Sequence, residues 1–197
     1  MKQPSEMPAH EIPYRILEMR GEARANILRM VAIIIFYGGE LLDFHFFHGV
    51  TREFQSVSTA IAIAWVMVSL LVWYAFKIQR YSPALKYVST GVDFTLLTFI
   101  ISVAHGPSSP MCMIFCLAIV LSGLRWSIRL IQFSTAAALL SYGVLFFQAE
   151  GRMPGRAVPP HHALIYSLCF LFTGVYMAQM LKLARKLLKT EVAHGPS

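Results

Sequence analysis

Histidine is the residue type in this 197-residue sequence whose positions point most directly to chemistry. Two of the seven histidines, His10 and His194, lie in the polar tails. The other five lie at the ends of apolar segments: His45, His48, His105, His161 and His162. Imidazole is the commonest metal ligand and a frequent haem ligand. If these ends meet on one side of a membrane, the sequence predicts a local cofactor site there.

Several interpretations of the five histidines stay open. They could gather at the headgroup level without any ligand, because amphipathic rings are comfortable there. They could bind haem b between two helices, with His45 or His48 facing His105, His161 or His162. The rings of Phe44, Phe46, Phe47 and Tyr166 would then cover the porphyrin. A Zn or Cu site would use two or three of the candidates His45, His48, His105 and His162, together with Glu40 or Asp43. A pH switch built on the same rings is a further possibility.

The elements that must position these residues are membrane spans. Hydrophobic residues make up 56% of the sequence and charged residues only 14%, whereas soluble domains are about a quarter charged. A hydrocarbon core of roughly 30 Å needs about 20 apolar residues per helix. We therefore expect an all-α, polytopic membrane protein, a six-transmembrane helix bundle. The expected spans are 27–47, 57–76, 85–104, 110–124, 128–148 and 163–183.

The basic residues predict the direction of the spans. All but three of the 17 lysines and arginines fall on one side, and the exceptions are Arg52, Arg152 and Arg156. The positive-inside rule then places both termini in the cytoplasm. Lipid headgroups account for the net charge of +7, so no nucleic-acid partner is expected. A lead-in helix over 12–29 would lay four arginines along the inner headgroups: Arg15, Arg20, Arg24 and Arg29.

The expected domains are a cytoplasmic segment with an interfacial helix (1–26), a six-helix transmembrane domain (27–183) and a cytoplasmic helical extension (184–197). The last span continues into this extension with an apolar seam at a spacing of 4, 3 and 4, formed by Met177, Leu181, Ala184 and Leu188. Such a seam is typical of a helix that transmits a signal in a homodimer. A basic end that only snorkels at the headgroups is the alternative.

Two acidic residues lie inside the expected spans. Intramembrane charges are costly and point to function. We expect Asp93 to face the bundle interior, with partners on the fifth span: Gln132, Ser141 or Tyr142. Glu40 follows Gly38 and Gly39, which would permit close helix packing. A lipid, a quinone or a metal could use Glu40.

Four short stretches carry a resemblance to a known family: Tyr81-Ser-Pro-Ala-Leu-Lys-Tyr, Val92-Asp-Phe-Thr-Leu-Leu, Gly106-Pro-Ser-Ser-Pro and Leu124-Arg-Trp. Together with six short-looped spans they resemble the amino-terminal membrane domains of bacterial class III adenylate cyclases. Similar domains precede some sensor histidine kinases. The resemblance implies a homodimeric receptor and anchor module that regulates a cytoplasmic cyclase or kinase effector, in cis or in trans.

The sequence contains neither the paired metal-binding Asp residues of a cyclase nor a kinase His and nucleotide-binding Gly motif. We therefore expect the membrane portion of a longer protein, or a free-standing relative, that is not an enzyme by itself. A function from a different class remains open, a b-type cytochrome-like redox protein that interacts with quinone.

Overall fold

The computed structural model describes residues 12–47, 51–77, 83–104, 106–152 and 158–193. Each apolar segment forms a helix, and the all-α prediction is confirmed. The helices are α1 (Ile12–Leu42), α2 (Arg52–Lys77), α3 (Pro83–Val103), α4 (Ile114–Gly123), α5 (Ile128–Arg152) and α6 (Pro160–Ala193). A π-helical turn, Asp43–Phe47, follows α1, and two 3-10 turns, Gly106–Ser108 and Pro110–Met113, precede α4.

Within the described ranges, four helices are long and apolar enough to cross a membrane, namely α2, α3, α5 and α6. The helical segment Pro110–Gly123, which includes α4, is apolar but shorter. Large apolar side chains cover the outside of these helices, as in Trp73, Phe147 and Phe172. Lipid tails are the natural surroundings for such a surface. The chain therefore has the helices of a multi-pass membrane protein.

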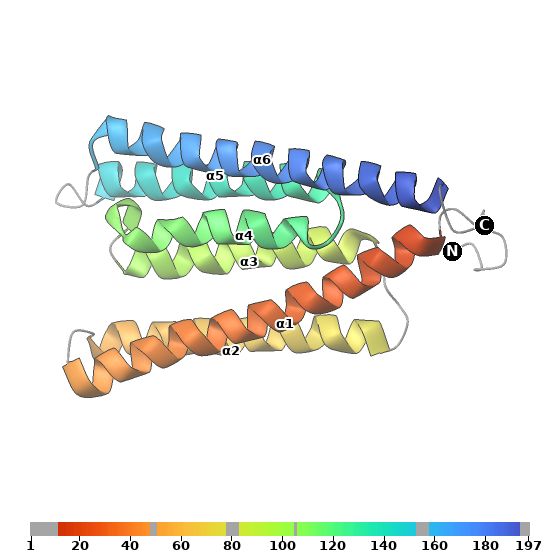
Figure 1. Cartoon of the computed structure of the whole chain (residues 1–197). Helices are drawn as coiled ribbons and strands as arrows, with labels where there is room; N and C mark the ends of the chain where they lie inside the picture. Colours follow the sequence, from red (N-terminus) through yellow and green to blue (C-terminus); the bar gives the residue numbers. More distant parts are fainter. Residues whose placement is uncertain (1–11, 48–50, 78–82, 105, 153–157, 194–197) are drawn as a thin grey trace.

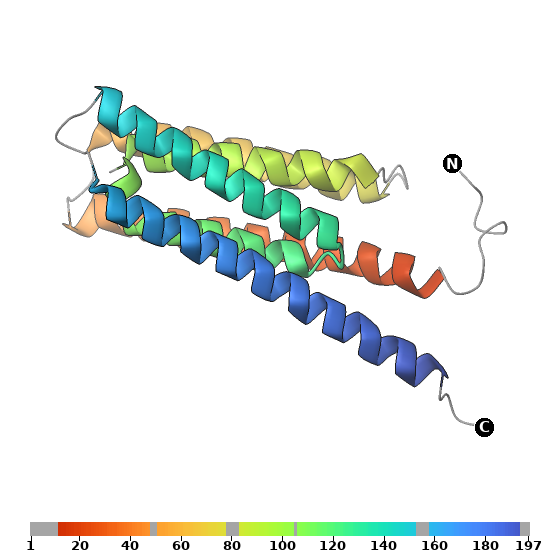
Figure 2. The same cartoon turned by 90° about the horizontal axis from the view of Figure 1, so that it is seen from above.

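The six helices form three pairs stacked side by side (Figure 1). The pair α5 and α6 lies at one margin, α3 and α4 lie in the middle, and α1 and α2 lie at the other margin. Helix α1 runs obliquely, since its beginning lies level with α3 and its end lies beside α2. Seen from above, the end of α6 and the beginning of α1 both extend beyond the other helices, on the side where both termini lie (Figure 2).

An aromatic core joins the middle pair to α5 and α6. Phe94 of α3 stacks on Phe115 of α4 at 5.8 Å, and Phe115 meets Phe170 of α6 edge-on at 5.8 Å. Tyr142 of α5 completes the cluster at 5.7 Å from Phe170. Rings in such offset and edge-on pairs add about 0.5–1.5 kcal/mol each beyond their buried area. This cluster packs α3, α4, α5 and α6 around one buried core.

Close approach at one glycine brings α6 onto α5. A Cβ atom at Gly174 would lie 2.1 Å from the hydroxyl oxygen of Thr135, a distance that no real Cβ atom tolerates. Only glycine therefore allows the two backbones to come this near, as in the small-residue contacts of membrane helices.

The helix ends correct two details of the sequence analysis. The α-helix of the first span ends at Leu42, so His45 lies on a wider π-helical turn. At Gly38 and Gly39, a Cβ atom would meet no heavy atom of the described residues within 4 Å. The expectation of close helix packing there is wrong, because this face of α1 is open.

The seam predicted on the last span lies against the bundle where its side chains are described. Leu181 is buried in the core, and Met177 packs against it, with its terminal methyl beside Gly123. Ala184 is half-buried, while the side chain of Leu188 lies outside the described part. Helix α6 continues unbroken to Ala193, past residue 183.

Candidate functional site: an intramembrane cavity

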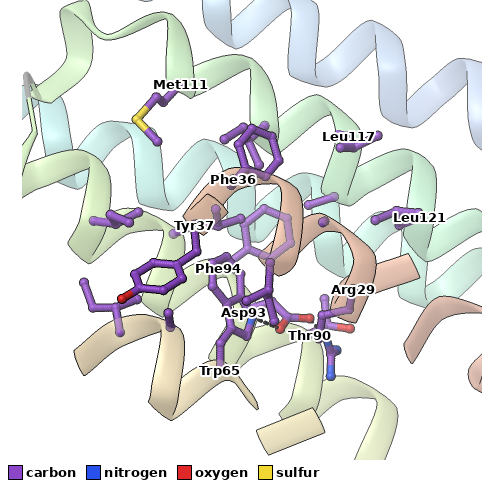
Figure 3. Close-up of a pocket in the computed structure, with 18 of the residues that line it drawn as sticks. Arg29, Phe36, Tyr37, Trp65, Thr90, Asp93, Phe94, Met111, Leu117 and Leu121 are labelled. Carbon is purple, nitrogen blue, oxygen red and sulfur yellow. Dashed lines mark hydrogen bonds and ion pairs between the residues drawn. The ribbon is translucent and has the colours of Figure 1, made fainter. Parts of the chain in front are cut away.

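A cavity of about 100 Å³ lies between α1, α2, α3 and α4. Apolar side chains such as Ile33, Phe36, Leu97 and Leu117 form most of its wall. Figure 3 shows Phe36 and Tyr37 of α1 on one side and Met111, Leu117 and Leu121 on the other. Pockets of this kind, apolar with a few placed polar groups, are the usual form of a ligand site.

The polar group of the cavity is an ion pair between α1 and α3. The guanidinium of Arg29 lies 2.5 Å from the carboxylate of Asp93, with the two side chains 6% and 17% exposed. Trp65 of α2 donates its indole N–H to the other oxygen of Asp93 at 2.7 Å. Arg29 also donates to the hydroxyl of Ser89 at 3.0 Å. The pair therefore joins three helices around one carboxylate, as the dashed lines in Figure 3 show.

This ion pair lies near mid-depth of the spans. Asp93 is the central residue of α3, a helix of 21 residues, and Trp65 lies next to the centre of α2, which has 26. A charge at this depth is costly unless it is paired, and such residues commonly mark ligand or ion pathways. The ion pair is therefore the strongest chemical feature in the described part of the chain.

A second network lies at the end of the cavity nearer the two termini, here called its inner end, around Arg125 in the turn between α4 and α5. Arg125 donates to the hydroxyl of Thr90 at 2.7 Å and to the backbone carbonyl of Lys86 at 3.1 Å, both on α3. Its Nε atom lies 3.4 Å from the carboxylate of Glu22 on α1. At Gly21 a Cβ atom would lie 2.3 Å from the carbonyl oxygen of Leu124, so α1 touches the turn backbone directly.

The same turn is connected to α6. Trp126 adopts a φ of +54°, a left-handed conformation that costs a bulky residue about 1–2 kcal/mol. Its backbone carbonyl accepts a hydrogen bond from the guanidinium of Arg185. The turn thus contacts the wall of the cavity through Arg125 and the inner part of α6 through Trp126.

At the outer end of the cavity, α1 is held to α2 by two polar contacts. The hydroxyl of Ser58 donates to the carboxylate of Glu40. The hydroxyls of Tyr37 and Thr59 lie 2.9 Å apart. Glu40 therefore has a hydrogen-bond partner on the neighbouring helix, and it also lines the cavity.

The structure does not assemble the predicted histidine site among the residues it describes. His45 is exposed and its ring bonds to the carbonyl of Leu41 at 3.0 Å. His161 and His162 are exposed neighbours with ring centres 4.6 Å apart. The end of α1 and the beginning of α6 lie at opposite margins of the bundle in Figure 1. His48 and His105 fall outside the described residues, so the haem and metal sites stay predictions.

Metal ligands do not gather elsewhere in the described ranges, which contain no group of three or more His, Cys, Asp or Glu side chains able to hold an ion. The cysteines Cys112, Cys116 and Cys169 are free thiols, and Cys112 is buried.

Sequence reasoning identified Asp93 as an inward-facing acid but named the wrong partners for it. Its partners are Arg29 and Trp65, and not Gln132, Ser141 or Tyr142. The placement of Arg29 along the inner headgroups is likewise wrong, because its guanidinium is buried against α3. One signal could have paired them: an acid deep in a span needs a nearby cation, and Arg29 lies inside the expected first span.

No protein-family model, curated protein or solved structure matches this chain. Arguments about function therefore depend on the geometry of the cavity and of the contacts that lead from it.

Proposed function

We propose that this protein is a receptor and anchor module that passes a signal from within the bilayer to a cyclase-like cytoplasmic effector. In this proposal all six helices span the inner membrane of a bacterium, both termini lie in the cytoplasm and the module acts as a homodimer. The basic residues on the side of the termini support this direction. The four short stretches that resemble cyclase membrane domains support the class of effector.

The observation that carries the proposal is a continuous series of contacts from the cavity to α6. Thr90 lines the cavity and binds Arg125. The next residue of the turn, Trp126, binds Arg185 of α6. A change in the cavity wall that moves Thr90 would therefore also move Arg125 and the turn between α4 and α5. Because this turn is bonded to Arg185, the movement would reach the inner part of α6. Helix α6 then extends beyond the bundle towards the effector (Figure 2).

A fusion of the full chain to a class III cyclase catalytic domain tests the proposal. The contact to be broken is the hydrogen bond from Arg185 to the backbone carbonyl of Trp126. Arg185→Gln removes the charge of this side chain and most of its hydrogen-bond donors. Lys182→Gln is the matched control, because Lys182 is an exposed cation on the same helix. We expect Arg185→Gln to change cyclic AMP formation at least about threefold at equal expression, while Lys182→Gln leaves it unchanged. Equal activity of all three fusions would refute the route through α6.

The redox alternative has one observation in its favour, the exposed pair of adjacent imidazoles His161 and His162 at the beginning of α6. A b-type cytochrome would show a Soret band that shifts on reduction. The test is an absorption spectrum of the purified chain with and without dithionite, together with metal analysis by mass spectrometry. A haem band reduced by quinol would favour this function, and a protein free of haem and metal would eliminate it.

A further inference from the structure

We infer that the cavity binds a neutral, membrane-soluble molecule with one apolar chain and a hydroxyl head, which donates a hydrogen bond to Asp93. Long-chain alcohols and quinols share this chemistry. The inference deepens the proposed function by naming the class of its input. Binding is measured below without any effector, so the two can fail separately.

The cavity is accessible from the side, through the wall between α1 and α4. Phe36 of α1 and Leu117 of α4 both line it, and they are 42% and 44% exposed at the surface of the bundle. In a bilayer this surface faces lipid tails. A molecule dissolved in the membrane can therefore reach the cavity without crossing the headgroups.

The shape of the cavity favours an extended chain. Its wall on α1 runs from Ala25 to Glu40, a rise of about 22 Å along the helix axis. Its volume of about 100 Å³ encloses only part of a chain of that length, so the rest of the chain would lie in the opening towards the lipid tails. A narrow, mainly apolar slot of this form suits a single acyl or isoprenoid chain better than a fused-ring ligand.

The head group follows from the hydrogen bonding of Asp93. An ionised carboxylate only accepts hydrogen bonds, and its two oxygens offer about four acceptor positions. Arg29 and Trp65 each donate to one of these oxygens, and the side chain, which lines the cavity, is 17% exposed. A ligand hydroxyl can fill a remaining acceptor position. Two carboxylates, Asp93 and Glu40, line the cavity, and its two arginines, Arg29 and Arg125, are already paired with Asp93 and Glu22. An anionic head would therefore be repelled.

The experiment is photolabelling of the full chain in lipid nanodiscs. The probe is hexadecanol with a diazirine on its chain, and the control probe is its methyl ether, which lacks the hydroxyl donor. We expect saturable labelling by the alcohol on α1 and α4, near Phe36 and Leu117. A hydrogen bond to a charged group corresponds to about a tenfold or greater difference in affinity. The ether should therefore label at least about tenfold less.

Two variants locate the site. Ala118→Phe fills the cavity from α4 and should reduce labelling at least about tenfold, while Ala136→Phe places the same ring on the exposed face of α5 and should not. Asp93→Asn should reduce the preference for the alcohol over the ether. Competition by unlabelled ubiquinol, a quinol, and farnesol, a long-chain alcohol, distinguishes the two sources of the hydroxyl. The molecule that reduces labelling more strongly identifies the natural class of ligand.

The inference is overturned if the ether labels as well as the alcohol, if ionised palmitate competes equally, or if labelling survives Ala118→Phe. The comparison of the two probes uses the unmodified chain, so it tests the inference even if a variant fails to fold. If the probe labels the cavity but Arg185→Gln leaves the cyclic AMP formation of the fusion unchanged, the proposed function is refuted and the inference stands. Activity that follows Arg185 without labelling would refute the inference alone.

Discussion

The ion pair between Arg29 and Asp93 predicts that the losses of stability on removing its two charges are not additive. Removing both charges should cost less stability than removing either one. The two side chains are 6% and 17% exposed, so a charge left alone finds neither water nor headgroups. Removal of one partner from a buried pair typically costs about 3–5 kcal/mol.

The magnitudes differ between the single and double variants. In Asp93→Leu, the guanidinium of Arg29 keeps Ser89 but loses its carboxylate, and the indole N–H of Trp65 loses its acceptor. We expect a loss of about 3–5 kcal/mol for this variant and a similar loss for Arg29→Met. In the double variant only neutral groups such as the Trp65 N–H lose a partner, which costs about 1–3 kcal/mol. The double variant should therefore be destabilised by at least about 3 kcal/mol less than the sum of the single variants.

The assay is unfolding of the purified chain by SDS in mixed micelles, followed by far-UV circular dichroism. Thr95→Ala is the control on α3, because Thr95 is exposed and its hydroxyl bonds to the carbonyl of Gly91. Its free energy of unfolding should stay within about 0.5 kcal/mol of the unmodified chain. Additive losses in the cycle, or a loss below about 1 kcal/mol for Asp93→Leu, would refute a buried, mutually dependent pair.

Three further predictions concern helix contacts and topology. Gly174→Ala should destabilise the chain, because its Cβ would meet Thr135 at 2.1 Å. Gly143→Ala should raise the free energy of unfolding by up to about 1 kcal/mol, because its Cβ would meet nothing within 4 Å among the described residues. Unfolding in SDS measures whether the two effects have opposite signs. Gly21→Ala should separate α1 from the carbonyl of Leu124 and speed proteolysis of the inner part of α1, while Gly38→Ala should not; equal digestion rates would contradict the contact. A fluorescent protein fused after Ser197 should fluoresce and alkaline phosphatase at the same position should be inactive, since the positive-inside rule places this end in the cytoplasm; the reverse pattern would invert the topology.

Helix positions were predictable to the extent that they follow from apolar length. The expected spans at 57–76, 85–104 and 128–148 lie within a few residues of α2, α3 and α5, because long apolar runs between Pro and Gly breaks leave few alternatives. The short fourth segment was also recognisable, and the structure divides it into a 3-10 turn and α4. The end of α1 was not, because the change to a π-helical turn at Asp43 has no hydrophobic signature.

The candidate site was predictable only in part. Asp93 and Glu40 are conspicuous as acids within apolar runs, and both line the cavity. The partner of Asp93 depends on how α1 tilts across α3, which is a tertiary property that periodicity does not encode. The same arginine count that predicts topology also led to the wrong place for Arg29. Positive residues near a span have two uses, at the headgroups or as counterions within the bundle, and their position along the chain does not distinguish these uses.

In the proposed function, the contacts of α1 explain how a ligand in the cavity would shift this helix. Helix α1 is held at its inner end, where Glu22 approaches Arg125, and at its outer end, where Glu40 binds Ser58. Between these points the cavity separates it from α4, and Arg29 is its buried ionic contact with α3. A ligand can shift such an arrangement only through a difference in its contacts with two states. The remaining acceptor positions of Asp93 provide that difference, because a hydroxyl bound there adds a contact to the state in which Asp93 lines the cavity.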